Sequence, residues 1–85
     1  MDKVNIIKSL ESMIPSGTLR IREAVLSNLR LLIPEGSIAN KHKLNVVGFA
    51  VGQLCKVESY ADIDWVAVTG LASDISTLLK NGFLD

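Results

Sequence analysis

The fold class of this chain is decided by residues 19–33, LRIREAVLSNLRLLI. Apolar residues recur there at spacings of three and four, which is the periodicity of an amphipathic helix. The pattern predicts a helix over residues 19–33, and the sequence after Pro34 ends it. The expected buried face comprises Ile21, Val25, Leu29 and Leu32, flanked by Leu26 and Ile33. The opposite face carries mainly Arg20, Arg22, Glu23, Ser27 and Arg30.

The segment before it, residues 2–14, shows the same rhythm. Pro15 disfavours helical geometry in the residue before it, so a helix is expected from about Asp2 to Ile14. Ser16-Gly17-Thr18 then supplies a turn and a hydroxyl that can cap the next helix. The apolar stripe of this first helix is Val4, Ile7, Leu10 and Ile14, widened by Ile6 and Met13.

A further helix is expected over residues 59–80. Ser59-Tyr60-Ala61-Asp62 places an acid three residues after a serine, as in a variant of the capping box, and Asp62 and Asp64 complement the positive end of a helix dipole. Asn81-Gly82 is a typical helix end, after which Phe83 or Leu84 is expected to fold back. The predicted core positions are Ile63, Val66, Ala67, Leu71, Ile75, Leu78 and Leu79.

Residues 44–55 allow two interpretations. As a helix they bury Leu44, Val47, Val51 and Leu54, beside a small-residue strip of Gly48, Gly52 and Cys55 that lets a neighbouring backbone approach. As a strand, residues 44–52 are β-branched and glycine-rich, which disfavours a helix. The three-four rhythm favours the helix. The fold class is therefore all-α, a single domain over residues 1–85 with about four bundled helices; the alternative is α+β with 44–52 as a strand.

Composition limits the class of protein. The 48% of hydrophobic residues with 21% charged residues is typical of a folded globular chain. A single cysteine, Cys55, allows neither an intramolecular disulfide nor a thiolate metal cluster. The longest apolar stretch, Val46 to Leu54, is about half of the roughly 20 residues that span a bilayer. We therefore expect a cytoplasmic protein with no membrane contact.

The sequence motifs that could indicate catalysis, metal binding or phosphate binding are incomplete. His42 lies between Lys41 and Lys43, with no neighbour in sequence to orient it as a base or ligand. Asp62 and Asp64 resemble the start of a calcium loop, but the glycine and terminal glutamate do not follow. Residues 48–52 lack the lysine and hydroxyl of a phosphate-binding loop. The sequence predicts no enzyme, with no catalytic residues, cofactor or metal.

Charge is unevenly distributed along the chain. Residues 1–43 carry seven basic and four acidic residues, a balance of +3, and residues 44–85 carry two basic and five acidic, a balance of −3. Three of the acids lie close in sequence to the only tryptophan and tyrosine. We call this group the acidic-aromatic patch: Glu58, Tyr60, Asp62, Asp64 and Trp65. Such residues suit an interface with a basic protein, although Trp65 could equally pack in the core while the acids complement the dipole.

Three functions follow as hypotheses. The first is a bacterial immunity or antitoxin-type inhibitor, whose acidic-aromatic patch covers the basic cleft of a nuclease toxin without chemistry. The second is a homodimeric structural or adaptor protein that uses the small-residue strip, or Leu31 and Phe49, as a self-interface. The third is a small DNA-binding regulator acting through Arg20, Arg22 and residues 41–43. The zero net charge disfavours nucleic acid as a partner.

Overall fold

The computed structural model describes residues 4–14, 19–33 and 36–84, and shows an all-α fold in that part of the chain. Its helices are α1 (Ile6–Met13), α2 (Leu19–Leu32), α3 (Lys41–Leu54) and α4 (Trp65–Lys80), with a 3₁₀ turn at Tyr60–Asp62. Two short strands, β1 (Val4–Asn5) and β2 (Ser37–Ile38), pair antiparallel, with Val4 opposite Ile38. The predicted helical bundle is confirmed. The turn expected at residues 15–18 lies outside the described residues.

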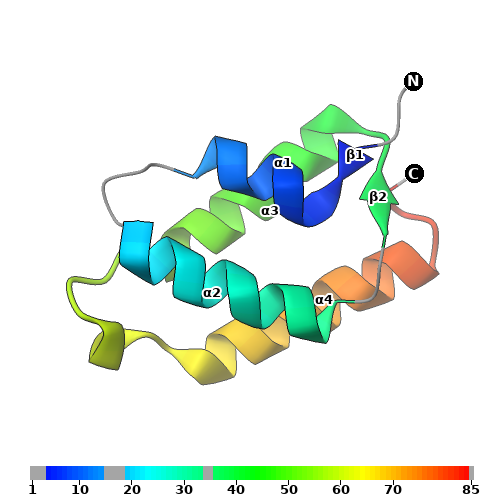
Figure 1. Ribbon diagram of the computed structural model, residues 1–85. Coiled ribbons are helices and arrows are strands. Elements are labelled where there is room, and N and C mark those ends of the chain that lie inside the picture. The colour runs from blue at the N-terminus through cyan, green and yellow to red at the C-terminus, as the bar shows by residue number, and fades with distance from the viewer. Residues whose placement is uncertain (1–3, 15–18, 34–35, 85) are drawn as a thin grey trace.

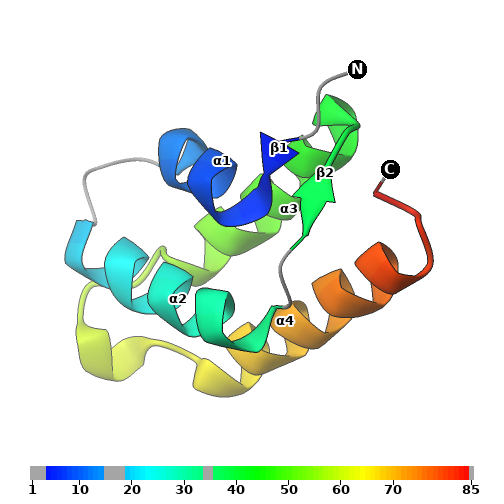
Figure 2. The same cartoon turned by 45° about the vertical axis from the view of Figure 1, so that its right-hand side comes forward.

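The four helices form a compact bundle in which α1 contacts α2 and α3, and α4 contacts the same two helices. Helices α1 and α3 run away from the β1–β2 pair, and α2 and α4 run back towards it (Figure 1). The β1–β2 pair and the end of α4 lie at one end of the bundle. The connection from α3 to α4 lies at the opposite end (Figure 2). This connection contains most of the acidic-aromatic patch.

The core is a single cluster to which every described helix contributes. Leu10, Leu29 and Val51 have no exposed surface, and Val68 and Ile75 from α4 are also fully buried. Burying such side chains contributes about 1.5 to 3 kcal/mol each, which opposes the conformational entropy lost on folding. No charged or polar residue in the described part is counted among the buried ones. The bundle is therefore held by apolar packing.

Helix α1 begins later than the sequence predicted. The expected start was Asp2, but Val4 and Asn5 are extended, and Asn5 Oδ1 accepts a hydrogen bond of 3.1 Å from the Lys8 backbone N–H. Asn5 is thus the N-cap, and the helix begins at Ile6. Pairing of Val4 with Ile38, far along the chain, fixes the extended geometry before the cap. Local periodicity contains no information about that partner.

Helix α2 follows the prediction with one exception. Ile21, Val25, Leu26 and Leu29 are buried in it, whereas Leu32 is nearly half exposed at its end. The next residue, Ile33, is buried after the helix and accounts for the core contact there.

Helix α3 settles the two interpretations of residues 44–55. Residues 44–52 lie within a continuous helix that buries Leu44, Val47 and Val51, so the strand alternative is wrong. Asn40 caps this helix by accepting from the backbone N–H groups of His42 and Lys43. Favourable capping and core packing outweigh the unfavourable helix propensity of the two glycines.

The glycines of α3 and α4 differ in what surrounds them. A Cβ added at Gly52 or Gly70 would meet nothing within 4 Å, whereas one at Gly48 would lie 2.9 Å from Met13 Cε.

Glycine inside a helix is about 0.8 to 1 kcal/mol less favourable than alanine. We expect Gly52→Ala and Gly70→Ala each to raise the free energy of unfolding by about that amount in urea titrations. Gly48→Ala should gain less, because Met13 must move; equal gains at all three positions would contradict the packing of α1 on α3.

Helix α4 starts at Trp65, later than expected. Ser59 caps only the 3₁₀ turn, and Asp64 caps α4 by accepting from the Ala67 backbone N–H at 3.0 Å. Ile63, between the two elements, is extended. The predicted helix over residues 59–80 is therefore interrupted there, and the spacing of three and four residues holds only from Trp65 onward. The buried residues of α4 are Val68, Ala72 and Ile75. Of the predicted core residues, Ile63 and Ile75 are buried and Val66 is exposed.

The chain end closes over the bundle as a helix C-terminal motif predicts. Gly82 has a φ of 70°, and the N–H groups of Gly82 and Phe83 donate to the carbonyls of Leu79 and Leu78. Leu84, rather than Phe83, then packs into the core. Its carbonyl accepts from the Ala39 N–H at 3.2 Å, next to β2.

Candidate protein-binding surface

The acidic-aromatic patch is built on the connection between α3 and α4. Ser59 Oγ accepts from the Ala61 backbone N–H at 3.2 Å and so starts the 3₁₀ turn. Ile63, between two exposed aspartates, is buried and fixes the connection to the core. The patch is therefore held from both sides by local hydrogen bonds and a buried anchor.

The two aromatic rings of the patch contact each other. The ring centroids of Tyr60 and Trp65 lie 5.8 Å apart with an angle of 60° between the planes, a favourable tilted arrangement. Tyr60 is 58% exposed, while Trp65 is half-buried against the core. The two aromatic residues therefore have different roles: Trp65 packs mainly against the core of the bundle, and Tyr60 is exposed to solvent.

The three acids of the patch also have different roles. Glu58 and Asp62 are exposed, and in the described ranges the ion pair found is between Arg30 and Glu11, which do not belong to the patch. Asp64 is exposed too, but its carboxylate is already the N-cap of α4. Glu58 and Asp62 are therefore the acids that are available to a partner.

A groove beside the patch was not predicted from the sequence. It has a volume of about 550 Å³ and is lined on one side by Leu19, Arg20 and Ile21 of α2 and on the other by residues 57–60. Only tertiary folding brings the start of α2 to this connection, so no local pattern could reveal it. Leu19, Ile21 and Val57 make part of the groove apolar. Arg20 adds one basic side chain to the groove that Glu58 and Tyr60 also line. The patch is therefore not purely acidic.

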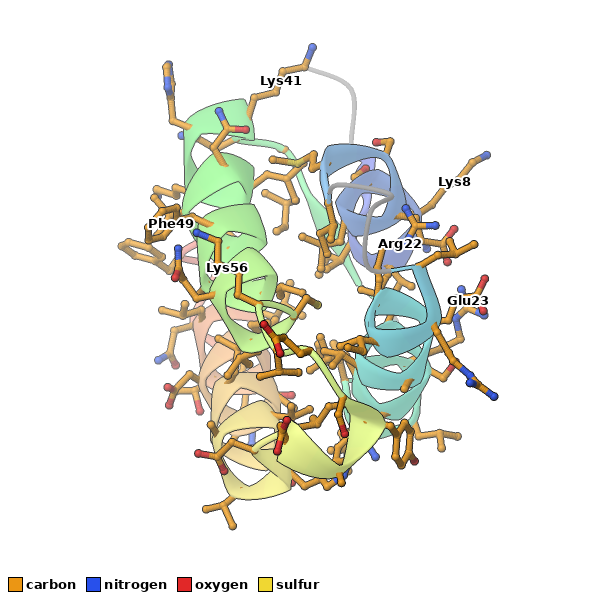
Figure 3. All side chains as sticks on the ribbon, turned by 90° about the vertical axis from the view of Figure 1, so that its left-hand side faces the viewer. Lys8, Arg22, Glu23, Lys41, Phe49 and Lys56 are labelled. Carbon is orange, nitrogen blue, oxygen red and sulfur yellow. The ribbon has the colours of Figure 1, made fainter. Side chains whose placement is uncertain are left out.

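Two basic residues named in the DNA-binding hypothesis have partners within the molecule. Arg22 Nη1 donates to the carbonyls of Glu11 at 3.2 Å and Ile14 at 3.4 Å, where its charge complements the end of α1. Lys43 Nζ donates to the Phe83 backbone carbonyl and lies 4.0 Å from the centroid of the Phe83 ring. In Figure 3, Arg22 is turned towards α1, whereas Lys41 projects from the start of α3.

Cys55 and His42 are the side chains that the sequence offered as candidates for chemistry. Cys55 is buried, and burial raises the pKa of its thiol, an effect that the nearby charge of Arg22 partly offsets. A raised pKa keeps the sulfur protonated and unreactive. His42 is exposed in the first turn of α3. Within residues 4–14, 19–33 and 36–84, no three His, Cys, Asp or Glu side chains gather as a metal site would require.

Comparisons with protein families, curated proteins and solved structures found no match for this chain. Across the residues that the structure describes, every helix falls short of the length and apolar character needed to cross a membrane.

Proposed function

We propose that this protein is a non-enzymatic protein-binding module that uses Glu58, Tyr60 and Asp62, with the adjoining groove, to hold a basic partner. The observation that carries the proposal is the exposed Tyr60 ring, supported from behind by Trp65 and flanked by two acids without a described ion-pair partner. Tyrosine supplies rigid contact area at low entropic cost, and acids around it steer a basic surface towards it.

Within this class, we propose a bacterial immunity or antitoxin-type inhibitor of a nuclease. A nuclease cleft binds phosphates and is basic, so an acidic surface can occupy it in place of the nucleic acid. Inhibition of this kind needs shape and charge but no chemistry in the inhibitor. Asp64 and Trp65 then serve mainly to build the surface, through the α4 cap and the support of Tyr60.

The test variant leaves those two residues intact. Glu58→Lys, Asp62→Lys and Tyr60→Ala are combined and compared with Glu23→Lys plus Asp74→Lys, two exposed acids elsewhere that give the same change in net charge. Each is titrated against the purified products of the genes adjacent to this one, with nucleic-acid cleavage and binding both measured. We expect the unmodified chain to block cleavage, the patch variant to bind at least about 100-fold more weakly, and the control to lose less than about tenfold.

Equal affinity of the patch variant and the control, with both folded by circular dichroism, would refute the assignment of the surface. A stable complex that leaves the nuclease active would refute the inhibitor version and retain the binding module. If no product of an adjacent gene binds, the inhibitor version also fails.

A further inference from the structure

A second surface, on the outer side of α3, has the opposite chemistry to the acidic-aromatic patch. Val46 and Phe49 are each 70% exposed and lie one turn apart, so their side chains are neighbours on the helix surface. His42 and Gln53 extend the same row at helical spacing and are also exposed. Figure 3 shows Phe49 directed away from the bundle.

This row differs from the two apolar side chains that are more exposed in the described part of the chain. Leu31 and Val66 are more exposed, but Leu31 stands beside Arg30 and Ser27 on α2, and Val66 beside Thr69 and Gly70 on α4. Scattered exposed side chains are normal, whereas an aromatic and a valine side by side form a contiguous patch. Phe49 and Val46 therefore need an explanation that Leu31 and Val66 do not.

Gly52 lies beside this row, one turn after Phe49. Among the described residues, a Cβ there would meet nothing within 4 Å, as is also true at Gly70 of α4. Gly48, by contrast, accommodates Met13. A glycine that weakens its helix without an internal contact leaves a shallow space beside Phe49, into which the backbone or a side chain of a partner fits.

The charges around the row indicate the kind of partner. Lys41 begins α3, Lys56 follows its end, and no acidic residue lies between them in the sequence. Figure 3 places both lysines along this helix. Two copies packed through α3 in antiparallel fashion would bring Lys41 of one towards Lys56 of the other, and like charges across an interface are unfavourable. A lipid surface is disfavoured as well, because only two apolar side chains project and binding scales with the apolar area inserted.

We infer that the outer face of α3 docks an acidic amphipathic helix of a partner protein. Its apolar face covers Val46 and Phe49, its backbone approaches at Gly52, and its acids meet Lys41 and Lys56. The inference goes beyond the proposed function, because it concerns a different face and a partner of opposite charge. The molecule would then present two binding surfaces.

The test uses the full chain and a synthetic helical peptide of leucine, alanine and glutamate, with leucines on one face and glutamates beside it. Amide NMR spectra locate the peptide, and fluorescence anisotropy gives its affinity. We expect saturable binding with a dissociation constant below about 0.1 mM and shifts centred on residues 42–53. Phe49→Ser should weaken binding about tenfold, and Val66→Ser, at a more exposed apolar position, should not change it.

Two further pairs of variants sharpen the result. Lys41→Glu plus Lys56→Glu should weaken binding about tenfold, whereas Lys8→Glu plus Lys80→Glu, with the same net charge, should change it less than threefold. Gly52→Ala should weaken binding although it stabilises the free protein, and Gly70→Ala should stabilise it without affecting binding. Thermal unfolding confirms that each variant is folded.

The following outcomes would overturn the inference: no binding; equal binding of a peptide with lysine in place of glutamate, or of one with scrambled leucines; and shifts centred on Tyr60. Concentration-dependent shifts at α3 without peptide would assign the face to a second copy. Stronger retention on anionic phosphatidylserine vesicles than on the peptide would assign it to lipid. None of these results bears on the patch variants, so failure of the two proposals is distinguishable.

Discussion

Leu29→Ala is expected to remove a large share of the free energy of unfolding. Leu29 is 0% exposed in the last turn of α2, and a buried leucine replaced by alanine lowers the free energy of unfolding by about 2 to 5 kcal/mol. Small domains are stable by only about 5 to 15 kcal/mol, so the loss is a substantial fraction of the whole stability. Urea unfolding followed by circular dichroism measures it.

The matched control lies two residues further along the same helix. Leu31 is 85% exposed, so Leu31→Ala removes the same atoms without creating a cavity. We expect its free energy of unfolding to stay within about 0.5 kcal/mol of the original. Similar losses for the two variants would mean that α2 does not present the face that the structure shows.

Leu84→Ala is expected to have the second largest effect, a loss of about 2 kcal/mol in the free energy of unfolding. Leu84 is 1% exposed, and the backbone reaches its position through the left-handed Gly82 and the two hydrogen bonds that close α4. The substitution should also loosen the contact between the Leu84 carbonyl and Ala39. Amide hydrogen exchange at Ala39 should therefore become faster, in parallel with a lower urea midpoint.

Phe83→Ala provides the comparison. Phe83 has the larger side chain but is 52% exposed, and its ring contact with Lys43 is worth at most about 0.5 to 1 kcal/mol at such a site. We therefore expect the leucine to matter more than the neighbouring phenylalanine. A larger loss for Phe83→Ala would show that the chain end packs the other way.

The sequence pattern predicted the elements well because helix periodicity and caps are local. The helix over residues 19–33 and the glycine that ends α4 depend on contacts within a few residues of each other. The errors arose where a distant partner intervened. Val4 is extended because Ile38 pairs with it. In the last helix, Ile63 and Ile75 are buried as predicted, but Val66 is exposed and Val68 is buried, because the helices that pack on α4 decide which of its side chains are covered.

The acidic-aromatic patch was only partly predictable for the same reason. Nearness in sequence grouped Tyr60 with Trp65, and their rings do contact each other. It left open whether the patch is exposed, and the structure places Glu58 and Asp62 in solvent. It could not show that Asp64 would be the cap of α4 or that α2 would supply Arg20 to the groove wall. Those assignments depend on the exact residue at which a helix begins and on which helices pack together.

The sequence by itself therefore determined the helical class, the approximate helices and the glycine that ends α4, because 3.6-residue periodicity and C-terminal helix motifs act over one or two turns. Only the tertiary structure decided which apolar side chains stay outside. Val46 and Phe49 remain on the surface because α3 packs on the bundle with its opposite side, and that choice is made by the neighbouring helices. Burial is a property of the assembled core, so a single stretch of sequence cannot assign it.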